Sequence, residues 1–226
     1  MADEDPVFET TTGPVRVITA ASLFDGHDAA INVMRRLIQS SGAEVIHLGH
    51  DQSAKAVVDC AVQEDAHAVA LTSYQGGHVE YFTYIRQLLD EAGCEHVRIF
   101  GGGGGTITPP EIRTLHQSGI SKIYSPDDGR TMGLMGMIHH LMGLAAEVDL
   151  IDDTRLASLD APVTADDMAK VGLLMTLSES ADEATFKAAV ETARSSDKEV
   201  PVIGFTGTGG AGKSSLLDEL MLRIQR

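Results

Sequence analysis

Apolar and polar residues alternate between two patterns over the first 145 positions of the chain. Short apolar runs, which are typical of buried parallel strands, are each followed by a longer stretch with helical spacing. In residues 28–41, for example, Ile31, Met34, Leu37 and Ile38 recur at the three- and four-residue intervals of one helix face. The pattern predicts five strands, at Val15–Ala20, Glu44–Leu48, Ala66–Thr72, His96–Phe100 and Ile120–Tyr124.

The predicted strands alternate with predicted helices. Gly42 and Gly93 follow two helical stretches, where a residue free to take positive φ commonly ends a helix. Pro109 and Pro110 fit the first turn of another helix. The predicted helices cover residues 28–41, 53–64, 79–92, a stretch from 109 and 131–144. Successive strand–helix units predict a doubly wound, flavodoxin-like α/β domain over residues 14–146, with a five-stranded parallel sheet between two layers of helices.

The pattern changes on both sides of this domain. Residues 1–13 are acidic and polar, which predicts a disordered or extended N-terminus. Residues 147–199 are rich in aspartate and glutamate, and we expect a linker with short helices over 166–177 and 182–195.

Charge and composition narrow the possible partners. Lys and Arg number 17 against 33 Asp and Glu, a formal net charge of −16, whereas binding to nucleic acid needs clustered basic residues. No apolar run approaches the ~18 residues that suggest a membrane span, and the N-terminus lacks a secretory signal. Cys60 and Cys94 show no metal-ligand spacing and fit reduced thiols. We therefore expect a cytoplasmic protein that binds neither nucleic acid nor membranes.

The first candidate site follows the first predicted strand, at Asp25-Gly26-His27-Asp28. A neutral imidazole binds cobalt and other late transition metals. A ligating histidine usually donates its other ring N–H to a carboxylate, and Asp25 is close enough along the chain to accept it. The alternative is an ordinary loop histidine bonded to Asp25 for local order, which the tripeptide by itself favours.

Two further loops fall at the same edge of the predicted sheet, where doubly wound folds bind their ligands. The loop after the third strand, Thr72-Ser73-Tyr74-Gln75-Gly76, offers small hydroxyls and bare backbone. The loop after the fourth strand holds five glycines, Gly101 to Gly105. Glycine runs are often flexible linkers, but flexibility between a strand and a helix lowers stability. We therefore interpret the run as backbone with something bulky lying against it.

These three elements resemble the cobalamin-binding domain of the adenosylcobalamin-dependent mutases. That family carries Asp-x-His-x-x-Gly, then a Ser-x-Leu element and then a glycine pair. Asp25 and His27 match the first element, and Ala30 stands in place of its glycine. The second falls on Thr72-Ser73-Tyr74, where tyrosine stands in place of leucine. The glycine pair falls within residues 101–105, and spacing leaves its register open.

The resemblance implies that adenosylcobalamin binds here with its own base displaced. His27 would be the lower axial ligand of cobalt, and the small residues would line a channel for the nucleotide tail. In the family, the cofactor generates a radical that rearranges the carbon skeleton of an acyl-CoA. The implied cofactor contacts are Asp25, Gly26, His27, Asp28, Thr72, Ser73, Tyr74, Gln75, Gly76, Gly101, Gly102, Gly103 and Gly104.

A second motif lies in residues 200–226, which predict the truncated start of a further domain. An apolar strand over 200–205 leads into Gly207-Thr208-Gly209-Gly210-Ala211-Gly212-Lys213-Ser214, and a helix follows over 213–224. This is the phosphate-binding loop pattern, in which the lysine reaches the terminal phosphates and the serine, here Ser214, binds Mg²⁺. The alternative is a glycine-rich loop that binds no nucleotide. The expected nucleotide contacts are Gly207, Gly209, Gly210, Ala211, Gly212, Lys213, Ser214 and Ser215.

The order of these parts resembles the fused isobutyryl-CoA mutases, which join a cobalamin domain, a GTPase chaperone domain and a catalytic barrel. The resemblance implies GTP and Mg²⁺ as ligands of a complete GTPase domain, and a homodimer. It also implies that the acyl-CoA is bound by a barrel that the chain lacks. We expect no catalytic residue in this chain, and neither GTP hydrolysis nor tight GTP binding by the fragment alone.

Two other hypotheses use the same fold. A corrinoid carrier or cobalamin-sensing module would use the same Asp-x-His loop without mutase activity. Carriers usually have a helical domain before the sheet, whereas about a dozen residues precede the first strand here. A receiver-type regulatory domain would want a phospho-acceptor aspartate at the end of strand three, where this chain has Thr72-Ser73.

Overall fold

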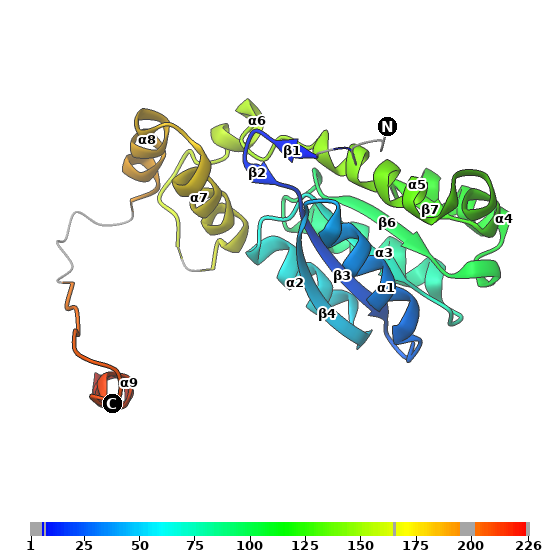
Figure 1. Cartoon of the computed structure of the whole chain (residues 1–226). Helices are drawn as coiled ribbons and strands as arrows, with labels where there is room; N and C mark the ends of the chain where they lie inside the picture. The colour runs from blue at the N-terminus through cyan, green and yellow to red at the C-terminus, as the bar shows by residue number, and fades with distance from the viewer. Residues whose placement is uncertain (1–5, 7, 165, 195–201, 225–226) are drawn as a thin grey trace, which may run out of the picture. The chain divides into compact units, whose positions relative to one another are not determined.

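The computed structural model describes residue 6 and residues 8–164, 166–194 and 202–224 (Figure 1). The chain divides into two compact units, residues 1–195 and 196–226, and each is described by itself.

The first unit is built on a five-stranded parallel sheet. Its strand order is β4-β3-β5-β6-β7, so the chain order reverses between β3 and β5. This confirms the predicted doubly wound, flavodoxin-like sheet. The strands are β3 (Arg16–Ser22), β4 (Glu44–Gln52), β5 (Ala68–Thr72), β6 (Arg98–Gly102) and β7 (Lys122–Tyr124).

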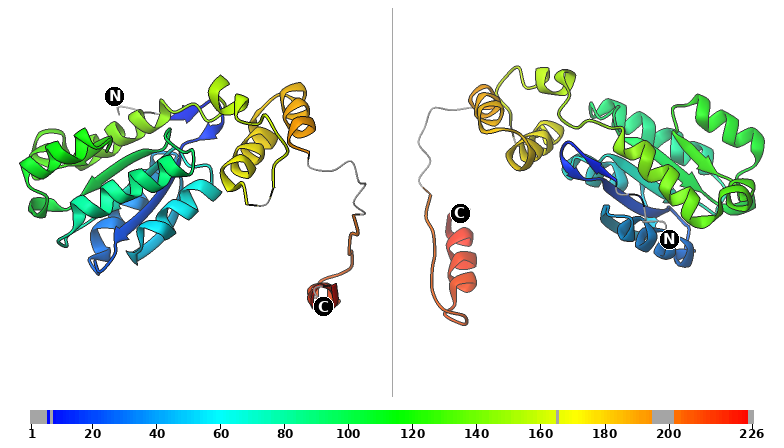
Figure 2. Two further views of the ribbon diagram at one scale, coloured as in Figure 1. Left: turned by 180° about the vertical axis from the view of Figure 1, so that it is seen from behind. Right: turned by 45° about the horizontal axis from the view of Figure 1, so that its top comes forward.

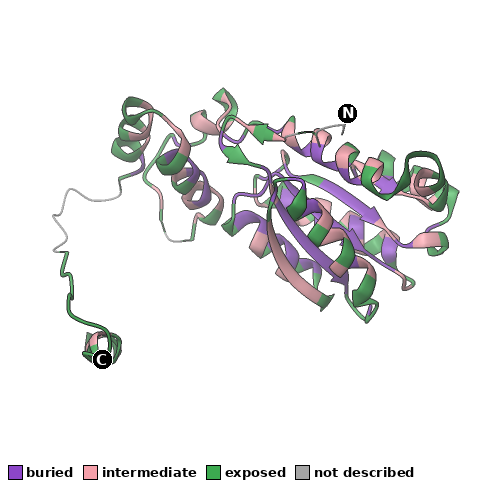
Figure 3. Ribbon diagram, viewed as in Figure 1, coloured by how far each residue is buried: buried purple, intermediate pink, exposed green. Residues whose placement is uncertain are grey.

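Helices cover both faces of the sheet (Figures 1 and 2). One face packs against α1 and α5, and the other against α2, α3 and α4. Neighbouring strand residues alternate between the faces. Val17 and Phe100 lie on the face covered by α1 and α5, whereas Ile18 and Ile99 lie on the face covered by α2, α3 and α4. Both faces of the central strands are therefore buried (Figure 3), which explains their continuous apolar runs. The helices are α1 (Asp28–Ser40), α2 (Ala54–Gln63), α3 (His78–Glu91), α4 (Pro109–Gln117) and α5 (Pro126–Ala146).

Two elements of the sheet domain are longer than predicted. β4 continues to Gln52, through register shifts against β3. α5 begins at Pro126 instead of residue 131, because Ser125 and Asp128 form a capping box and the proline fits the first turn. Gly133 interrupts this helix with φ 67° and ψ 175°.

The N-terminal segment is extended where it is described. β1 (Glu9–Thr10) and β2 (Gly13–Pro14) pair as a short antiparallel ribbon. Part of the segment expected to be disordered or extended, residues 1–5 and 7, lies outside the described residues.

The structure corrects the expected domain boundary at residue 146. The helices α6 (Asp153–Ala157), α7 (Met168–Ser180) and α8 (Glu183–Ala193) belong to the same compact unit as the sheet. α7 packs so closely on α2 that a Cβ at Gly172 would lie 2.9 Å from the Val62 carbonyl oxygen. The stretch expected as a linker therefore forms part of the domain up to residue 194.

The second unit contains α9 (Lys213–Ile224), which begins and ends where predicted. The strand predicted over 200–205 is not found: residues 202–205 are irregular, and residues 200 and 201 lie outside the described part. A strand needs a neighbour to satisfy its backbone groups, and no strand of the described residues pairs with this segment. Every helix in the described part of the chain is too short or too polar to cross a lipid bilayer.

Candidate functional site

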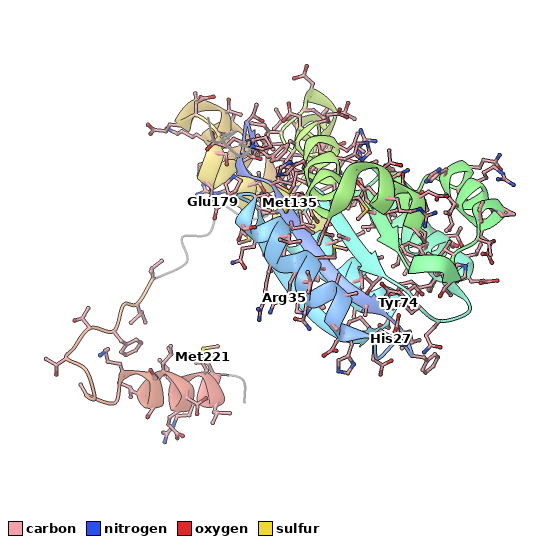
Figure 4. The ribbon with its side chains drawn as sticks, turned by 45° about the vertical axis from the view of Figure 1, so that its right-hand side comes forward. His27, Arg35, Tyr74, Met135, Glu179 and Met221 are labelled. Atoms are coloured by element: carbon pink, nitrogen blue, oxygen red, sulfur yellow. The ribbon has the colours of Figure 1, made fainter. Side chains whose placement is uncertain are left out.

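The candidate site lies where the strand order reverses, at the carboxyl ends of β3 and β5. The loops after these two strands contact each other directly. The Ser22 hydroxyl donates to the Ser73 hydroxyl over 2.8 Å, and the Tyr74 N–H donates to Asp25 Oδ2 over 2.6 Å. Figure 4 shows His27 and Tyr74 side by side at this edge. The fold therefore brings together two of the three loops that the sequence singled out.

Asp25 and His27 form a pair with one buried and one exposed member. The Asp25 side chain is fully buried, whereas 65% of the His27 side chain is exposed. His27 Nδ1 lies 2.7 Å from Asp25 Oδ1, and the His27 backbone N–H donates to the same oxygen over 2.9 Å. Because a carboxylate only accepts hydrogen bonds, Nδ1 carries the proton, and in the neutral ring Nε2 keeps its lone pair.

Asp25 is held as a charged acceptor. Burial by itself would raise its pKa, but the hydrogen bonds from the Tyr74 N–H and from His27 outweigh burial and keep the pKa below its ordinary value. The carboxylate is thus ionised at neutral pH and makes a charge-assisted bond to the imidazole, which fixes the ring.

The surroundings of His27 also orient its ring. The Tyr74 ring packs against it at a centroid distance of 5.4 Å and an interplanar angle of 47°. α1 begins directly after it, with His27 at the N-cap and Asp28 in the first turn, where a negative charge is favourable. Gly26 and Asp28 are exposed beside it.

An apolar cavity of about 70 Å³ opens behind this edge, between the sheet and the helices α1 and α5. Its wall contains Thr72, whose hydroxyl is buried and has no hydrogen-bond partner. Buried polar atoms in native proteins rarely lack a partner, and a bound ligand or water would supply one here. The remaining lining residues are Ile31, Met34, Ile38, Ala70, Leu71, Phe100, Gly101, Gly102, Tyr124, Met137, Ile138 and Leu141.

The glycine run has more than one cause. A Cβ at Gly101 would lie 2.4 Å from the Phe82 ring, and one at Gly103 would lie 1.9 Å from the Ser73 carbonyl oxygen. At these two positions, the bulk predicted to lie against the backbone is the protein itself. A Cβ at Gly102 would meet only the Tyr124 carbonyl oxygen, at 3.5 Å. Gly104 has φ 57° and lies near the Tyr74 ring.

The rest of the Thr72 loop shapes the start of α3. The Gln75 carbonyl lies 3.1 Å from His78 Nδ1, and Gly77 has φ 80° at the N-cap. Gly76 is exposed. We assign these residues to the loop's shape, since the contacts of the described residues place none of them in the cavity wall.

Sequence reasoning missed two parts of the site. One is the helical wall of the cavity, which includes Met34 and Met137. The helical spacing of Met34 with Ile31 and Ile38 was visible, but no residue type marked that face as a ligand wall. The other is Asp51, whose carboxylate accepts a hydrogen bond from the Phe24 N–H over 2.6 Å.

The two cysteines belong to the core rather than to a site. Cys94 is buried and Cys60 is partly buried, and both are free. Burial raises the pKa of each thiol to about 11, so both are protonated and unreactive at neutral pH.

In the second unit, the predicted nucleotide residues up to Gly212 lie in the loop before α9, and Lys213, Ser214 and Ser215 are the first residues of α9. Lys213 Nζ donates to the carbonyl oxygens of Gly207 and Thr208, both over 2.8 Å. Gly210 and Gly212 have φ values of 76° and 78°, which suit glycine. Ala211, Ser214 and Ser215 are exposed.

Comparison with known proteins places this site in a family. The model described as "B12 binding domain" matches residues 15–127, which covers all five strands. The chain is 50% identical over 217 residues to the fused isobutyryl-CoA mutase of Geobacillus kaustophilus and 53% identical over 213 residues to that of Cupriavidus metallidurans. These matches cover 93% of this chain, but only 20% and 19% of the relatives.

A shorter relative matches about half of the chain. The 2-hydroxyisobutanoyl-CoA mutase small subunit of Aquincola tertiaricarbonis is 33% identical over 115 residues, which cover 50% of this chain and 82% of that protein. The chain thus spans about a fifth of the length of its fused relatives and most of the length of a separate subunit. Together with its sheet and its site, these matches show that the chain belongs to the B12-binding domain family.

Proposed function

We propose that this chain is the cobalamin-binding part of an adenosylcobalamin-dependent acyl-CoA mutase, with His27 as the lower axial ligand of cobalt. The observation that carries the proposal is the Asp25–His27 pair. A buried, ionised carboxylate holds Nδ1 of an exposed imidazole and leaves Nε2 with its lone pair. That is the carboxylate–histidine arrangement that orients a metal ligand and raises its basicity.

The metal-ligating side chains of this site suit a metal that is already held by a cofactor. Among the described residues, no group of three His, Cys, Asp or Glu side chains could hold a metal ion by itself. A single imidazole suits a corrin, in which the macrocycle supplies most of the ligands to cobalt. When bound, adenosylcobalamin supplies the radical chemistry, and the protein contributes orientation, exclusion of water and the axial ligand.

We propose that the cavity behind His27 receives the nucleotide tail of the cofactor. The unpartnered Thr72 hydroxyl offers a hydrogen bond, and Gly102 leaves space beside the sheet. Met34 and Met137 line the helical side, and their flexible side chains can rearrange around an aromatic group. These residues would hold the tail against an apolar wall.

The relatives support a more specific reaction for the whole protein. Two of them are fused isobutyryl-CoA mutases, and we propose accordingly that the whole protein is an isomerase that converts isobutyryl-CoA to n-butyryl-CoA. The acyl-CoA would bind to a catalytic barrel outside this chain, so we assign no catalytic residue here. We also propose that the whole protein is a cytoplasmic homodimer.

The loop at residues 207–215 supports a fused GTPase domain. Its glycines adopt the conformations of a tight turn before a helix, and a helix N-terminus of this kind binds phosphate. Lys213 now donates to loop carbonyls that phosphates could replace as partners. We expect no GTP hydrolysis by this chain alone, measured as phosphate release with GTP and Mg²⁺. Hydrolysis that disappears in Lys213→Ala would contradict this expectation.

The proposed cobalt ligand is tested by titrating the chain with adenosylcobalamin and following the absorbance of the cofactor. The electron paramagnetic resonance spectrum of reduced cofactor bound to ¹⁵N-histidine-labelled protein should show coupling to one histidine nitrogen. His27→Ala should lose this coupling and weaken binding by about 100-fold or more, since even residues behind a metal ligand contribute about 10–100-fold. His50→Ala, an exposed histidine on β4, is the matched control. Unchanged spectra and affinity in His27→Ala would exclude His27 as the ligand.

The tail cavity is tested in the same experiment with Thr72→Val. Removing a buried hydroxyl without a partner should stabilise the cofactor-free protein by about 1 kcal/mol in urea unfolding. The same change should weaken cobalamin binding, because the tail loses a hydrogen-bonding group. A variant that is more stable and binds equally well would show that Thr72 does not contact the cofactor.

A further inference from the structure

The turn that carries Asp25 has an unusual backbone conformation. The Asp25 N–H donates to the Ser22 carbonyl over 3.0 Å and closes a turn whose third residue is Phe24. Phe24 has φ 64°, in a region that a bulky residue rarely adopts and that turns usually give to glycine or asparagine. Phe24 is 77% exposed, so burial of its ring does not maintain this conformation.

Asp51, at the end of β4, maintains it instead. Asp51 Oδ1 accepts a hydrogen bond from the Phe24 N–H over 2.6 Å, and the Asp51 N–H donates to the Asp25 carbonyl over 3.2 Å. The two bonds hold the backbone on both sides of the peptide between Phe24 and Asp25. Asp51 itself has φ 57°, which aspartate and asparagine tolerate better than most residues.

Irregular pairing between β3 and β4 brings Asp51 to this position. Thr19 pairs with His47, but Ala20 pairs with Gly49 and Ser22 with Gln52, so β4 carries extra residues at two places. Such bulges redirect side chains near functional sites. The Gln52 carbonyl accepts a hydrogen bond from the Tyr81 hydroxyl over 2.9 Å, which ties the end of β4 to α3.

We propose that Asp51 is a positioning residue for His27, an inference that rests on the proposed function. Asp25 is held at two levels: its carboxylate binds His27 and Tyr74, and its backbone is bonded to Asp51. Without the Asp51 carboxylate, Phe24 is free to return to negative φ, which rotates Asp25 and with it the imidazole. Asp51 thereby sets the direction of His27 Nε2 without touching the cofactor.

Three substitutions separate the parts of this role. Asp51→Asn keeps an acceptor oxygen and tolerates positive φ. Asp51→Gly keeps the backbone conformation but removes the acceptor, and Asp51→Ala removes both. We expect Asp51→Gly and Asp51→Ala to bind adenosylcobalamin about 10-fold more weakly or worse, with reduced histidine coupling in the electron paramagnetic resonance spectrum. Asp51→Asn should keep most of the affinity and the coupling.

A second measurement needs no cofactor. Amide hydrogen exchange of peptides covering residues 22–28 should be faster in Asp51→Gly and Asp51→Ala than in the unsubstituted chain, while the sheet core stays protected. Asp59→Ala, which removes an exposed carboxylate bonded to Lys55, is the control and should change neither measurement.

The outcomes distinguish this inference from the proposed function. If Asp51→Gly binds cofactor and exchanges hydrogen like the unsubstituted chain, the carboxylate does not position His27 and the inference is wrong. If the unsubstituted chain shows no histidine coupling, the proposed function fails, while the exchange rates still report whether Asp51 holds the turn.

Discussion

Two buried aspartates lie at opposite ends of the sheet and serve different purposes. Asp25 follows β3 and is fully buried, and Asp65 precedes β5 and is 3% exposed. Asp65 accepts hydrogen bonds from Arg155 Nη2 over 2.5 Å and from the Thr176 hydroxyl over 2.7 Å. The Arg155 side chain is only 11% exposed, whereas the histidine bonded to Asp25 is 65% exposed.

The difference shows that burial of a carboxylate does not by itself indicate a binding site. Both charges are satisfied by hydrogen bonds, but only the partner of Asp25 has a ring nitrogen open to solution. At the other end, Arg16 donates to the Thr176 hydroxyl and to the Glu64 carbonyl, both over 2.8 Å, which closes the network. That network joins the sheet to the helices α6 and α7, so its role is structural.

The largest expected effects come from removing each carboxylate in turn. Asp65→Ala leaves the buried Arg155 guanidinium without its partner and should lower the free energy of unfolding by about 3–5 kcal/mol. The folded fraction should bind cobalamin normally. Asp25→Ala should cost less stability, about 1–3 kcal/mol, but should weaken cobalamin binding by about 10–100-fold. Urea unfolding and cofactor titration measure the two effects.

Asp59→Ala, at an exposed ion pair, serves as the control for both variants and should change stability by no more than about 0.5 kcal/mol. If Asp65→Ala weakened binding as strongly as Asp25→Ala while remaining folded, the two ends of the sheet would not be independent, and the comparison would fail.

A comparable effect is expected from pH, and it should arise at the Asp65 end. Burial, with Arg16 nearby, lowers the pKa of His67 to about 4, and burial, with Arg155 nearby, lowers that of His96 to about 4. Unfolded histidines take up a proton near pH 6.5, so stability should be constant above that pH and fall as pH drops toward 4. The expected loss is on the order of 2–3 kcal/mol per histidine.

The Asp25 end should respond only in stronger acid. The pKa of Asp25 is held below the ordinary value of 3.8, so the contribution of Asp25 to stability persists above that pH and is lost as pH falls through the lower value.

The His67→Asn variant tests the histidine contribution. Its amide oxygen can replace Nδ1 as acceptor for the Arg16 N–H, and the fall in the free energy of unfolding between pH 6.5 and 4 should become smaller. Urea unfolding at a series of pH values checks this, and an unchanged slope would place the acid sensitivity elsewhere.

The sheet could be predicted because its central strands, β3 and β5, are buried on both faces and therefore read as apolar runs. The site could be located because doubly wound folds gather the ends of β3 and β5, which carry Asp25 and Ser73. Pairing irregularities leave no mark in a sequence, so the position of Asp51 beside Phe24 could not be seen.

Other elements could not be predicted from the sequence, for different reasons. The acidic stretch after residue 146 suggested a linker, but Leu159, Leu173 and Leu177 within it form a small core of their own. Because α5 contains glycines near its start, its first turns were not predicted from the sequence. The strand expected over 200–205 has an apolar sequence, yet an apolar run becomes a strand only beside a partner.

Gly101 has a consequence for how relatives of this chain can vary. Because a Cβ there would meet the Phe82 ring and the end of the Ile123 side chain, a larger residue at position 101 requires both neighbours to give way. Position 101 should therefore change together with positions 82 and 123 among homologues. Position 102 carries no such link to a neighbouring side chain, and variation there instead alters the space beside Thr72. Two adjacent glycines are thus constrained differently, Gly101 by core packing and Gly102 by the cavity.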